Sequence, residues 1–425
     1  MDITWVKRSP YWMPIKSFFQ AFDAYSVDNS RPLLHFDPSI TGQGITSRVY
    51  FTDHSAIKVY QSQELLSEAH RESIRSEAQV AKALMKHPSD RFPHFVRIGR
   101  TPSTGIEVLE AEGNVRSLPD TDNREFVEME RISGPGLDQL LALRKMLVDH
   151  PLTHEEKETF SPLKRYWNPE GWDQLSDPDK ERRMASYRIA VLKAMADFAS
   201  IVEELHALGF YHRDLKPDVI RISPRGPVML DFGSALRRED ISPSTEVGFI
   251  FTNHYLAPEL TPFMKEKNDG YVIDSTHYTP QIDVYSLGQC LAYLMTGTPS
   301  SIYGEMFRMT PENLPNELVV QLVHTSMAQD IHQRLPDPKA LKLMLKSLLW
   351  LEGQIDTRDL TQVELHPEVL DELKALKEQF HQQPTYSIAE STARKLYHEE
   401  SMAKIQIDAS SSGEISGVFD DWDEE

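Results

Sequence analysis

The hydrophobic pattern changes its period once along this 425-residue chain, near "ISGPG" at residues 132–136. Before that point, short runs alternate apolar and polar residues, and residues 63–86 are rich in Glu, Ala, Leu and Lys. This pattern predicts one helix over 63–86 and strands within 38–60, 94–99, 105–113 and 125–132. After that point, apolar residues recur every three to four positions over 186–208, and residues 283–297 are apolar on several faces, which predicts two helices. A β-rich part followed by a helical part predicts an α+β fold.

Composition separates the remaining segments. Residues 1–37 carry aromatic side chains without a clear period and are expected to form an N-terminal extension. A polar segment with several prolines, 145–184, is expected to be an insert. Residues 351–404 are expected to form a helical C-terminal extension, with an apolar stripe over 363–380. Residues 405–425 contain acidic and no basic side chains, which predicts a disordered acidic tail.

Charge and cysteine content exclude several classes of protein. The chain has 65 acidic and 45 basic residues and a formal net charge of -20, which argues against a nucleic-acid partner. One cysteine, Cys290, cannot form an internal disulfide, and this favours a reducing compartment. No apolar run approaches the ~18 residues that a membrane span requires. We therefore expect a cytoplasmic protein without a membrane span, and its oligomeric state stays open.

Three features of the β-rich part suit a phosphate donor. The segment "GQGITSRV", from Gly42 to Val49, lies between strand-like runs, where glycines let backbone N–H groups approach phosphate oxygens. Lys58 in "SAIKVY" follows in an apolar strand, where an ammonium needs a partner. Glu77 on the predicted helix is the favoured partner, ahead of Glu72 and Glu68. A simple hairpin turn and a solvated strand lysine are the alternatives.

Two motifs in the helical part combine carboxylates with cations. The stretch "HRDLK" places Asp214 two positions before Lys216. Asp214 is suited to accept a hydrogen bond from a substrate hydroxyl, and Lys216 to contact a transferring phosphate. "LDFGSA" follows an extended run, and its carboxylate, Asp231, is suited to hold magnesium.

The order G-x-G, Lys, Glu, HRDLK, DFG, APE, D-x-Y-S-x-G and Arg makes the chain resemble the eukaryotic-type serine/threonine protein kinases. The resemblance covers roughly residues 40–350 and implies a bilobal kinase-like fold, with a β-rich N-lobe over 38–132 and a mainly helical C-lobe over 133–350. ATP would bind between the lobes, and its γ-phosphoryl group would be transferred to serine or threonine hydroxyls of a protein substrate. Small-molecule kinases are a further alternative, but they usually lack the "APE" segment.

The resemblance also implies roles for particular residues. Met129 would guard the back of the ATP pocket, Glu130–Ile132 would form the hinge, and His212 and Phe232 would join a hydrophobic column. The cofactors would be ATP and Mg²⁺, with Mn²⁺ as an alternative metal held by Asp231. Asp214 and Lys216 would be catalytic, and the nucleotide site would comprise Gly42, Gly44, Val49, Ala56, Lys58, Glu77, Met129, Glu130 and Ile132.

A possible phosphorylation switch lies between "DFG" and "APE". Arg213 is suited to receive a phosphate from this segment, which contains Ser242, Ser244 and Thr245. The alternative is that these are ordinary loop hydroxyls, and both interpretations stay open.

Four positions depart from the family's pattern. Val219 replaces the asparagine that usually holds a second magnesium ion, although Asp218 is a candidate substitute. Arg221 replaces an apolar residue under adenine. Ser47 replaces the third glycine of the loop, and Phe251 stands where a glycine usually precedes the threonine. The first two changes, at Val219 and Arg221, support an alternative to an active kinase, namely a pseudokinase that acts as a nucleotide-gated or nucleotide-free scaffold.

Overall fold

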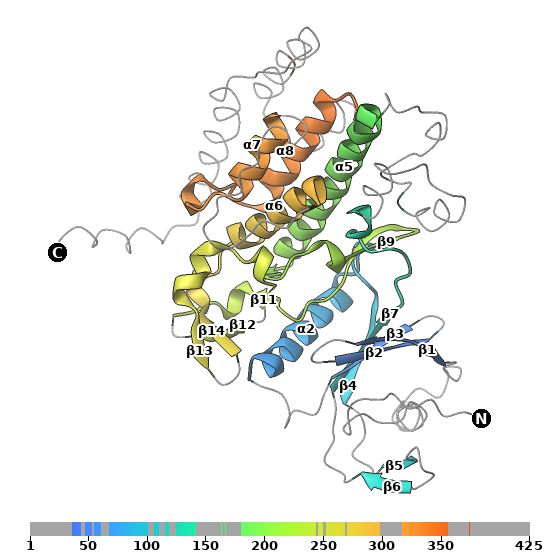
Figure 1. Ribbon diagram of the computed structural model, residues 1–425. Helices are drawn as coiled ribbons and strands as arrows, with labels where there is room; N and C mark the ends of the chain where they lie inside the picture. Colours follow the sequence, from blue (N-terminus) through green and yellow to red (C-terminus); the bar gives the residue numbers. More distant parts are fainter. Residues whose placement is uncertain are drawn as a thin grey trace, which may run out of the picture. The chain divides into compact units, whose positions relative to one another are not determined.

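The structure is a computed structural model in which contacts divide the chain into two units (Figure 1). It describes residues 36–43, 47–52, 55–60, 68–100, 106–109, 115–118, 125–141, 163, 166, 180–243, 245–249, 252–267, 270–297, 317–355 and 374. Unit 1 comprises Met1–Leu143, Leu152–Arg165 and Glu204–Thr279, and unit 2 comprises Arg144–Pro151, Tyr166–Glu203 and Pro280–Glu425. The N-terminal extension before residue 36, the acidic tail and the stripe over 363–380, apart from residue 374, lie outside the described residues. The predicted domain boundaries stay predictions.

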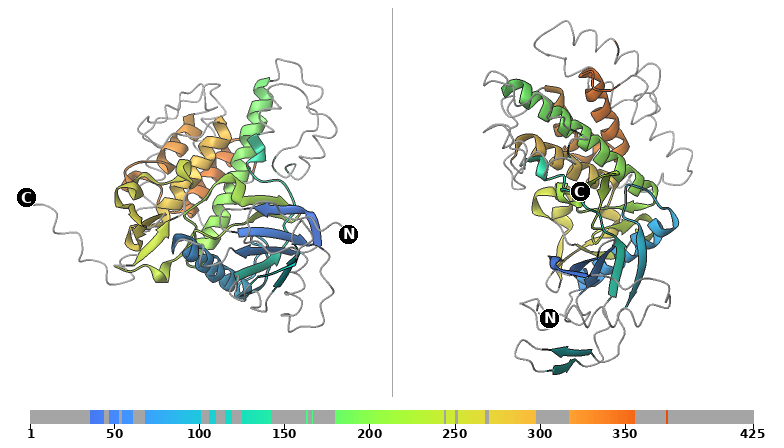
Figure 2. Two further views of the ribbon diagram at one scale, coloured as in Figure 1. Left: turned by 60° about the horizontal axis from the view of Figure 1, so that its bottom comes forward. Right: turned by 90° about the vertical axis from the view of Figure 1, so that its right-hand side faces the viewer.

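A five-stranded antiparallel sheet is the first part of unit 1 (Figures 1 and 2). Its strands, in spatial order, are β1 (Phe36–Gln43), β2 (Ser47–Thr52), β3 (Ser55–Tyr60), β7 (Glu125–Glu130) and β4 (Phe95–Arg100). β3 is buried along most of its length, in agreement with its apolar composition. The strands β5 (Ile106–Leu109) and β6 (Val115–Leu118) form a separate two-stranded ribbon, of which sequence analysis predicted only the first strand.

Helix α2 (Glu68–Lys86) matches the predicted helix, whose first residues lie outside the described part of the chain. Its apolar side chains recur with a helical period, and Ile74, Val80, Ala81 and Leu84 are all buried. The helix contacts β4 and also a strand from much later in the chain, β12 (Glu246–Phe249). It is therefore held on two sides within unit 1.

Two short ribbons set the positions of the loops that follow. β8 (Phe210–Tyr211) pairs with β11 (Leu236–Arg237), and β9 (Ile220–Ser223) pairs with β10 (Gly226–Met229). The loop 212–219 therefore leaves β8 and enters β9, while the loop 230–235 leaves β10 and enters β11. Because each end of one loop pairs with an end of the other, the two predicted catalytic motifs lie side by side.

A three-stranded sheet in unit 1 was not predicted from the sequence. It has the order β12, β14 (Gly270–Asp274) and β13 (Lys265–Lys267), with antiparallel pairing throughout. It follows the DFG motif and flanks the segment that contains Thr252. Short 3-10 turns connect these parts of the chain and the later helices, namely η5 (Pro217–Val219), η6 (Arg238–Asp240), η7 (Asn253–Tyr255), η8 (Pro258–Phe263), η9 (Ser275–His277) and η10 (Ile331–Gln333).

Unit 2 is helical where it is described (Figure 2). Its helices are α5 (Lys180–Ala207, whose last residues from Glu204 belong to unit 1), α6 (Pro280–Thr296), α7 (Glu317–Ser326) and α8 (Pro338–Leu351). α6 contacts both α7 and α8, and buried side chains lie along nearly its whole length, as its apolar pattern predicted. Since α5 begins at Lys180, the last residues of the predicted insert, 180–184, are helical. Cys290 is buried in α6, in agreement with a packing role.

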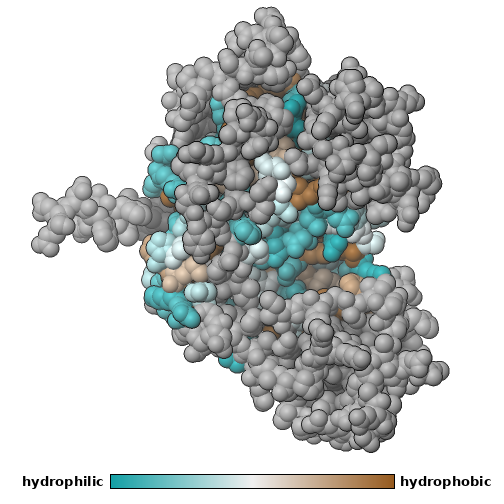
Figure 3. Space-filling model, in the orientation of Figure 1, coloured by the Kyte–Doolittle hydropathy of each residue, from teal (hydrophilic) through white to brown (hydrophobic). Residues whose placement is uncertain are grey.

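The surface of the described residues is mainly polar on the face seen in Figure 3, with smaller hydrophobic areas between the polar ones. The large apolar side chains that are clearly exposed among the described residues are Met85, Phe263 and Tyr271. None of the helices in the described part of the chain is long and apolar enough to cross a bilayer.

Gly134 permits a close approach between the "ISGPG" segment and β9. Its φ of 127° is in the left-handed region. A Cβ at this position would lie much closer to the Ile222 carbonyl oxygen than van der Waals contact allows. The Ile222 N–H also donates to the Pro135 carbonyl at 2.9 Å. We expect Gly134→Ala to lower the free energy of unfolding by about 2 kcal/mol or more, from backbone strain plus steric clash. Denaturant unfolding measures this loss.

Gly209→Ala is the matched control for Gly134→Ala. Gly209 also has a positive φ, 89°, but no neighbouring atom lies within 4 Å of the point that a Cβ would occupy. This variant should therefore show the backbone strain without the clash. Equal losses in the two variants would contradict the importance of the contact with Ile222.

Candidate active site

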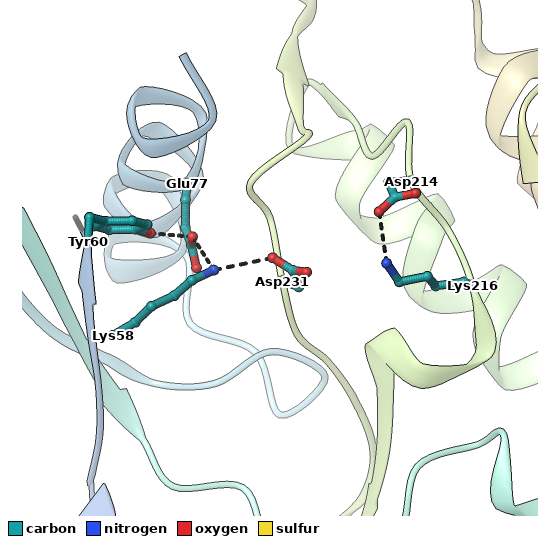
Figure 4. Close-up of polar contacts among 6 residues, drawn as sticks. All are labelled: Lys58, Tyr60, Glu77, Asp214, Lys216 and Asp231. Carbon is teal, nitrogen blue, oxygen red and sulfur yellow. Dashed lines mark hydrogen bonds and ion pairs between the residues drawn. The ribbon is translucent and has the colours of Figure 1, made fainter. Parts of the chain in front are cut away.

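Lys58 lies at the centre of the first half of the site (Figure 4). Its ammonium donates to Oε2 of Glu77 at 2.7 Å and to Oδ1 of Asp231 at 3.3 Å. The three residues come from β3, α2 and the loop after β10, and all belong to unit 1. The structure thus joins Lys58 to Glu77, the partner favoured from the sequence, and adds Asp231 as a second partner.

Burial and charge shift the pKa values of this group. Burial of the ammonium acts to lower the pKa of Lys58, but the carboxylates of Glu77 and Asp231 outweigh it and hold that pKa above its usual value. The Lys58 ammonium, against the effect of burial, lowers the pKa of Asp231 from 3.8 to about 2. The Asp231 side chain is 53% exposed, so solvent screens part of this attraction. These pKa shifts keep both Lys58 and Asp231 charged at neutral pH.

The low pKa of Asp231 predicts a pH dependence of stability. A carboxyl whose folded pKa lies below its unfolded value stabilises the fold above the unfolded pKa and loses this effect as pH falls. We therefore expect the melting temperature of the wild type to exceed that of Asp231→Asn by a constant margin from pH 8 to about 5. The margin should shrink between about pH 4 and 2, and thermal melts in a pH series measure it. A margin that grew on acidification would contradict the assigned shift.

Tyr60 is a member of this group that sequence analysis missed. Its hydroxyl donates to Oε2 of Glu77, the same oxygen that Lys58 contacts, and its ring lies 5.6 Å from the Lys58 ammonium. Burial, followed by the negative charge of Glu77, raises the pKa of Tyr60 well above its usual value. Its position two residues after Lys58 on one strand places both side chains on one face and was the available signal.

The second half of the site surrounds Asp214. Its Oδ2 accepts a hydrogen bond from the Lys216 ammonium at 3.0 Å, and its Oδ1 accepts one from the backbone N–H of Thr252 at 3.0 Å. Lys216 also donates to the Thr252 hydroxyl at 3.3 Å. Burial acts to lower the pKa of Lys216, but Asp214 raises it overall. The three residues therefore form a closed triangle of polar contacts.

Two residues of the site adopt positive φ angles although they are not glycine. Arg213 has a φ of 69° and Asp231 a φ of 63°. Such strained backbone persists where the surrounding structure fixes it, and it occurs often at functional sites. Arg213 is buried, its Nε donates to the Ser234 carbonyl, and its guanidinium lies 4.8 Å from the centre of the Tyr278 ring.

Phe232 anchors the DFG segment in the core of unit 1. Its ring centre lies 6.0 Å from that of Phe92, 6.2 Å from that of Phe95 and 6.0 Å from that of His212. Phe232 itself is 1% exposed. His212 and Phe232 thus pack together, as the resemblance implied for the hydrophobic column.

The sheet register aligns much of the predicted nucleotide site. Gly42 pairs with Val49, and Val49 pairs with Lys58, so these residues form a row across three strands. Ala56 pairs with Met129 on the neighbouring strand β7. Paired residues and their i+2 neighbours share one face, so the non-glycine side chains lie on the Lys58 face of the sheet. Gly44 lies outside the described residues.

The predicted hinge begins at the end of β7. The Glu130 carboxylate accepts from Arg225 at 2.9 Å and lies 3.3 Å from Nδ1 of His94. Arg225, in the turn between β9 and β10, also donates to the Phe92 carbonyl at 3.0 Å. Ile132 follows in irregular backbone and is partly buried. Arg225 thus helps to position the end of β7, where the hinge is predicted, and sequence analysis missed this contact.

The departures from the family's pattern have distinct environments. Val219 is 3% exposed and lies in η5, and its carbonyl accepts from the Leu230 N–H at 2.7 Å. Asp218 is an exposed residue, yet partial burial of its carboxyl raises its pKa, against the Lys216 ammonium. The Arg221 guanidinium reaches the Gly134 carbonyl at 3.5 Å. Ser47 is buried and pairs with Tyr60, while Phe251 lies outside the described residues.

The residues present fit a magnesium ion that is held jointly with phosphates. Within the described ranges, no group of three or more His, Cys, Asp and Glu side chains is arranged to hold a metal ion. Magnesium in nucleotide sites is commonly held by one or two carboxylates plus substrate phosphates. Asp231, with its low pKa and half-exposed carboxylate, matches that type of donor.

Comparison with known proteins finds similarity to protein kinases. Residues 170–352 match the family model of the protein kinase domain, a range that includes Asp214, Lys216 and Asp231. The serine/threonine-protein kinase MRCK gamma of Mus musculus is 37% identical over 107 residues, which cover 24% of this chain and 6% of that protein. The protein kinase MCK1 of Saccharomyces cerevisiae is 34% identical over 127 residues, which cover 29% of this chain and 28% of that protein.

The kinase domain of Mycobacterium tuberculosis PknI is a solved structure that aligns with 73% of this chain and 95% of its own, with a TM-score of 0.43 at 14% sequence identity. The chain spans less than a third of the length of the two curated relatives above. On the family match and these relatives, residues 170–352 are similar to the protein kinase domain, and the mixed helices and strands of the described residues are consistent with the expected bilobal kinase-like fold.

Proposed function

We propose that this chain is an active serine/threonine protein kinase that transfers the γ-phosphoryl group of ATP to protein hydroxyls. The observation that carries the proposal is the Lys58 ammonium, which contacts both Glu77 and Asp231. This contact joins the predicted donor clamp, which is Lys58 with Glu77, to the predicted metal ligand, Asp231. A cytoplasmic location is proposed with it, from the single cysteine of the sequence.

The donor side of the site binds and orients the nucleotide. The Lys58 ammonium would contact the α- and β-phosphates, and Glu77 would keep Lys58 in place. Gly42, Val49 and Ala56 would cover the nucleotide from the sheet. Asp231 would hold the metal ion, and the bound ion would neutralise charge on the phosphates.

The acceptor side orients the hydroxyl group of the substrate. Asp214 would accept a hydrogen bond from this hydroxyl and take its proton as the oxygen attacks the γ-phosphorus. The bond from the γ-phosphorus to the bridging oxygen breaks, and ADP leaves. Lys216 would stabilise charge on the transferring group. Its hydrogen bond to Thr252 supports serine/threonine specificity, because the resemblance associates both residues with that class.

Val219 favours a second candidate function, that of a pseudokinase scaffold. Its side chain is buried and has no lone pair for a metal ion. A site with one carboxylate ligand would then bind nucleotide without efficient turnover, or bind none. The insert and the acidic tail would serve such a scaffold as partner-binding segments.

A phosphorylation assay separates these functions. Purified full chain is incubated with labelled ATP and a mixture of protein substrates, with Mg²⁺ and with Mn²⁺, beside the Asp214→Asn variant. Label on serine or threonine that disappears in the variant supports the kinase. Label that persists in the variant, or its absence with both metals, refutes it.

A thermal shift with Mg-ATP then distinguishes the remaining cases, because a ligand that binds the folded state raises its melting temperature. A shift without turnover indicates a nucleotide-gated scaffold, and no shift indicates a nucleotide-free one. Turnover on a free sugar or amine, with none on protein, indicates a small-molecule kinase.

A further inference from the structure

Tyr60 lies where it contacts both members of the Lys58–Glu77 pair (Figure 4). It is the last residue of β3 and is 1% exposed. Its hydroxyl is a hydrogen-bond donor to Glu77, and the Lys58 ammonium lies over its ring. A buried tyrosine commonly gives its hydroxyl a polar partner, and here that partner is a residue of the proposed donor clamp.

The distribution of charge shows why Glu77 needs a second donor. The Glu77 carboxylate side chain is 1% exposed, whereas that of Asp231 is 53% exposed and can be solvated by water. Both carboxylates share one ammonium, that of Lys58. A buried carboxylate is costly unless hydrogen bonds compensate for its lost hydration. The Tyr60 hydroxyl supplies such a bond without adding charge.

The other contacts of α2 hold the helix but do not hold the Glu77 carboxylate itself. On the side away from the sheet, the Glu72 carboxylate accepts from the Gly248 N–H of β12 at 2.5 Å. Ser73 lies close to Gly233, because a Cβ on that glycine would be 2.5 Å from the Ser73 hydroxyl oxygen. Neither contact reaches Glu77, whose carboxylate is held among the described residues by Lys58 and Tyr60.

We infer that Tyr60 is a positioning residue that holds the Glu77 carboxylate in place when Lys58 turns toward the donor phosphates. The inference rests on the proposed function for the role of Lys58. Phosphates compete with Glu77 for the Lys58 ammonium, and this competition would loosen α2 if Lys58 were the sole donor. The Tyr60 hydroxyl takes no part in binding phosphate and stays on Glu77.

The Tyr60→Phe variant tests this role, since it removes the hydroxyl and keeps the ring. We expect the KM for ATP to rise about fivefold, as one hydrogen bond to a charged group is lost, while kcat changes less than about twofold. The Kd of a fluorescent ATP analogue should rise in parallel. A KM that stays unchanged, or a kcat that falls as much as kcat/KM, would overturn the inference.

Tyr187→Phe is the matched control variant. The Tyr187 hydroxyl is also buried and donates to the Leu294 carbonyl at 2.7 Å, within unit 2. Its loss should lower the melting temperature by a similar amount and leave the KM for ATP unchanged. If both variants raise the KM equally, Tyr60 acts through general stability and the inference is wrong.

Two measurements make the test specific and independent of turnover. In a Glu77→Ala background, Tyr60→Phe should cause no further rise in the Kd, because its partner is absent. In the otherwise unchanged chain, Tyr60→Phe should accelerate amide hydrogen exchange over residues 74–80 of α2. Unchanged exchange overturns the inference even in a chain that binds no nucleotide. The absence of nucleotide binding by the wild type refutes the proposed function alone.

Discussion

The Asp214→Asn variant is expected to lose phosphoryl transfer by about 10²- to 10⁴-fold, the usual contribution of a positioned general base. Asparagine keeps a carbonyl oxygen that can accept from the Thr252 N–H, which now bonds Oδ1 of Asp214 at 3.0 Å. The loop should therefore keep its conformation while the group that takes the proton is lost. Steady-state kinetics with saturating ATP measure the fall in kcat.

Binding of ATP is the control for this variant. Among the described residues, the Asp214 carboxylate bonds Lys216 and Thr252 rather than Lys58 or Asp231. The Kd of ATP should therefore change less than about threefold, a free-energy difference under about 1 kcal/mol. If kcat falls less than tenfold, Asp214 is not the base. A large rise in the Kd would instead indicate that the substitution disturbs the donor side.

Lys58→Met is expected to reduce both stability and nucleotide binding. The substitution removes an ammonium from Glu77, whose side chain is 1% exposed, and leaves a buried carboxylate with the Tyr60 hydroxyl as its donor. Breaking a buried ion pair in this way costs about 3 kcal/mol or more. Denaturant unfolding should show this loss, and isothermal titration should show little remaining affinity for Mg-ATP.

A second substitution separates the two effects of losing Lys58. Glu77→Gln in the Lys58→Met background removes the uncompensated charge, and its side-chain carbonyl can still accept from Tyr60. Most of the lost stability should return, since replacing both members of a buried pair is often close to neutral. Binding of Mg-ATP should not return. Recovery of binding in the double variant would show that Lys58 does not contact the nucleotide.

Local motifs made much of the site predictable. Asp214 and Lys216 lie within one short stretch, and Asp231 follows soon after, so their chemistry can be inferred before any fold is known. Lys58 needed one additional argument, because a lysine in an apolar strand requires a carboxylate partner. Helical spacing then favoured Glu77, and the ion pair is present at 2.7 Å. The catalytic and nucleotide roles of these residues stay predictions.

Other features depend on contacts between distant segments, and the local sequence gives little signal for them. In the sequence, Tyr60 resembles an ordinary strand residue. Its hydrogen bond to Glu77 of α2 is evident only in the folded structure. The strands β12 and β14 are short and contain Gly248 and Gly270, so alternation of apolar residues is hard to recognise. Arg225 occupies a turn between two strands, where a basic residue is usually solvated. Only the fold shows that it bonds Glu130.

The charged groups around Lys58 affect whether ATP reaches the site before or after it binds a divalent cation. The five charged groups of Figure 4 are the ammoniums of Lys58 and Lys216 and the carboxylates of Glu77, Asp214 and Asp231, two cations against three anions. With these groups ionised, the net charge before a ligand arrives is negative, and like charges repel. Free ATP would therefore be repelled on approach, whereas a nucleotide already complexed with a divalent cation would be repelled less. If the site binds ATP, this difference in repulsion would favour association of the metal complex over free ATP. Added salt would screen the charges and reduce the difference.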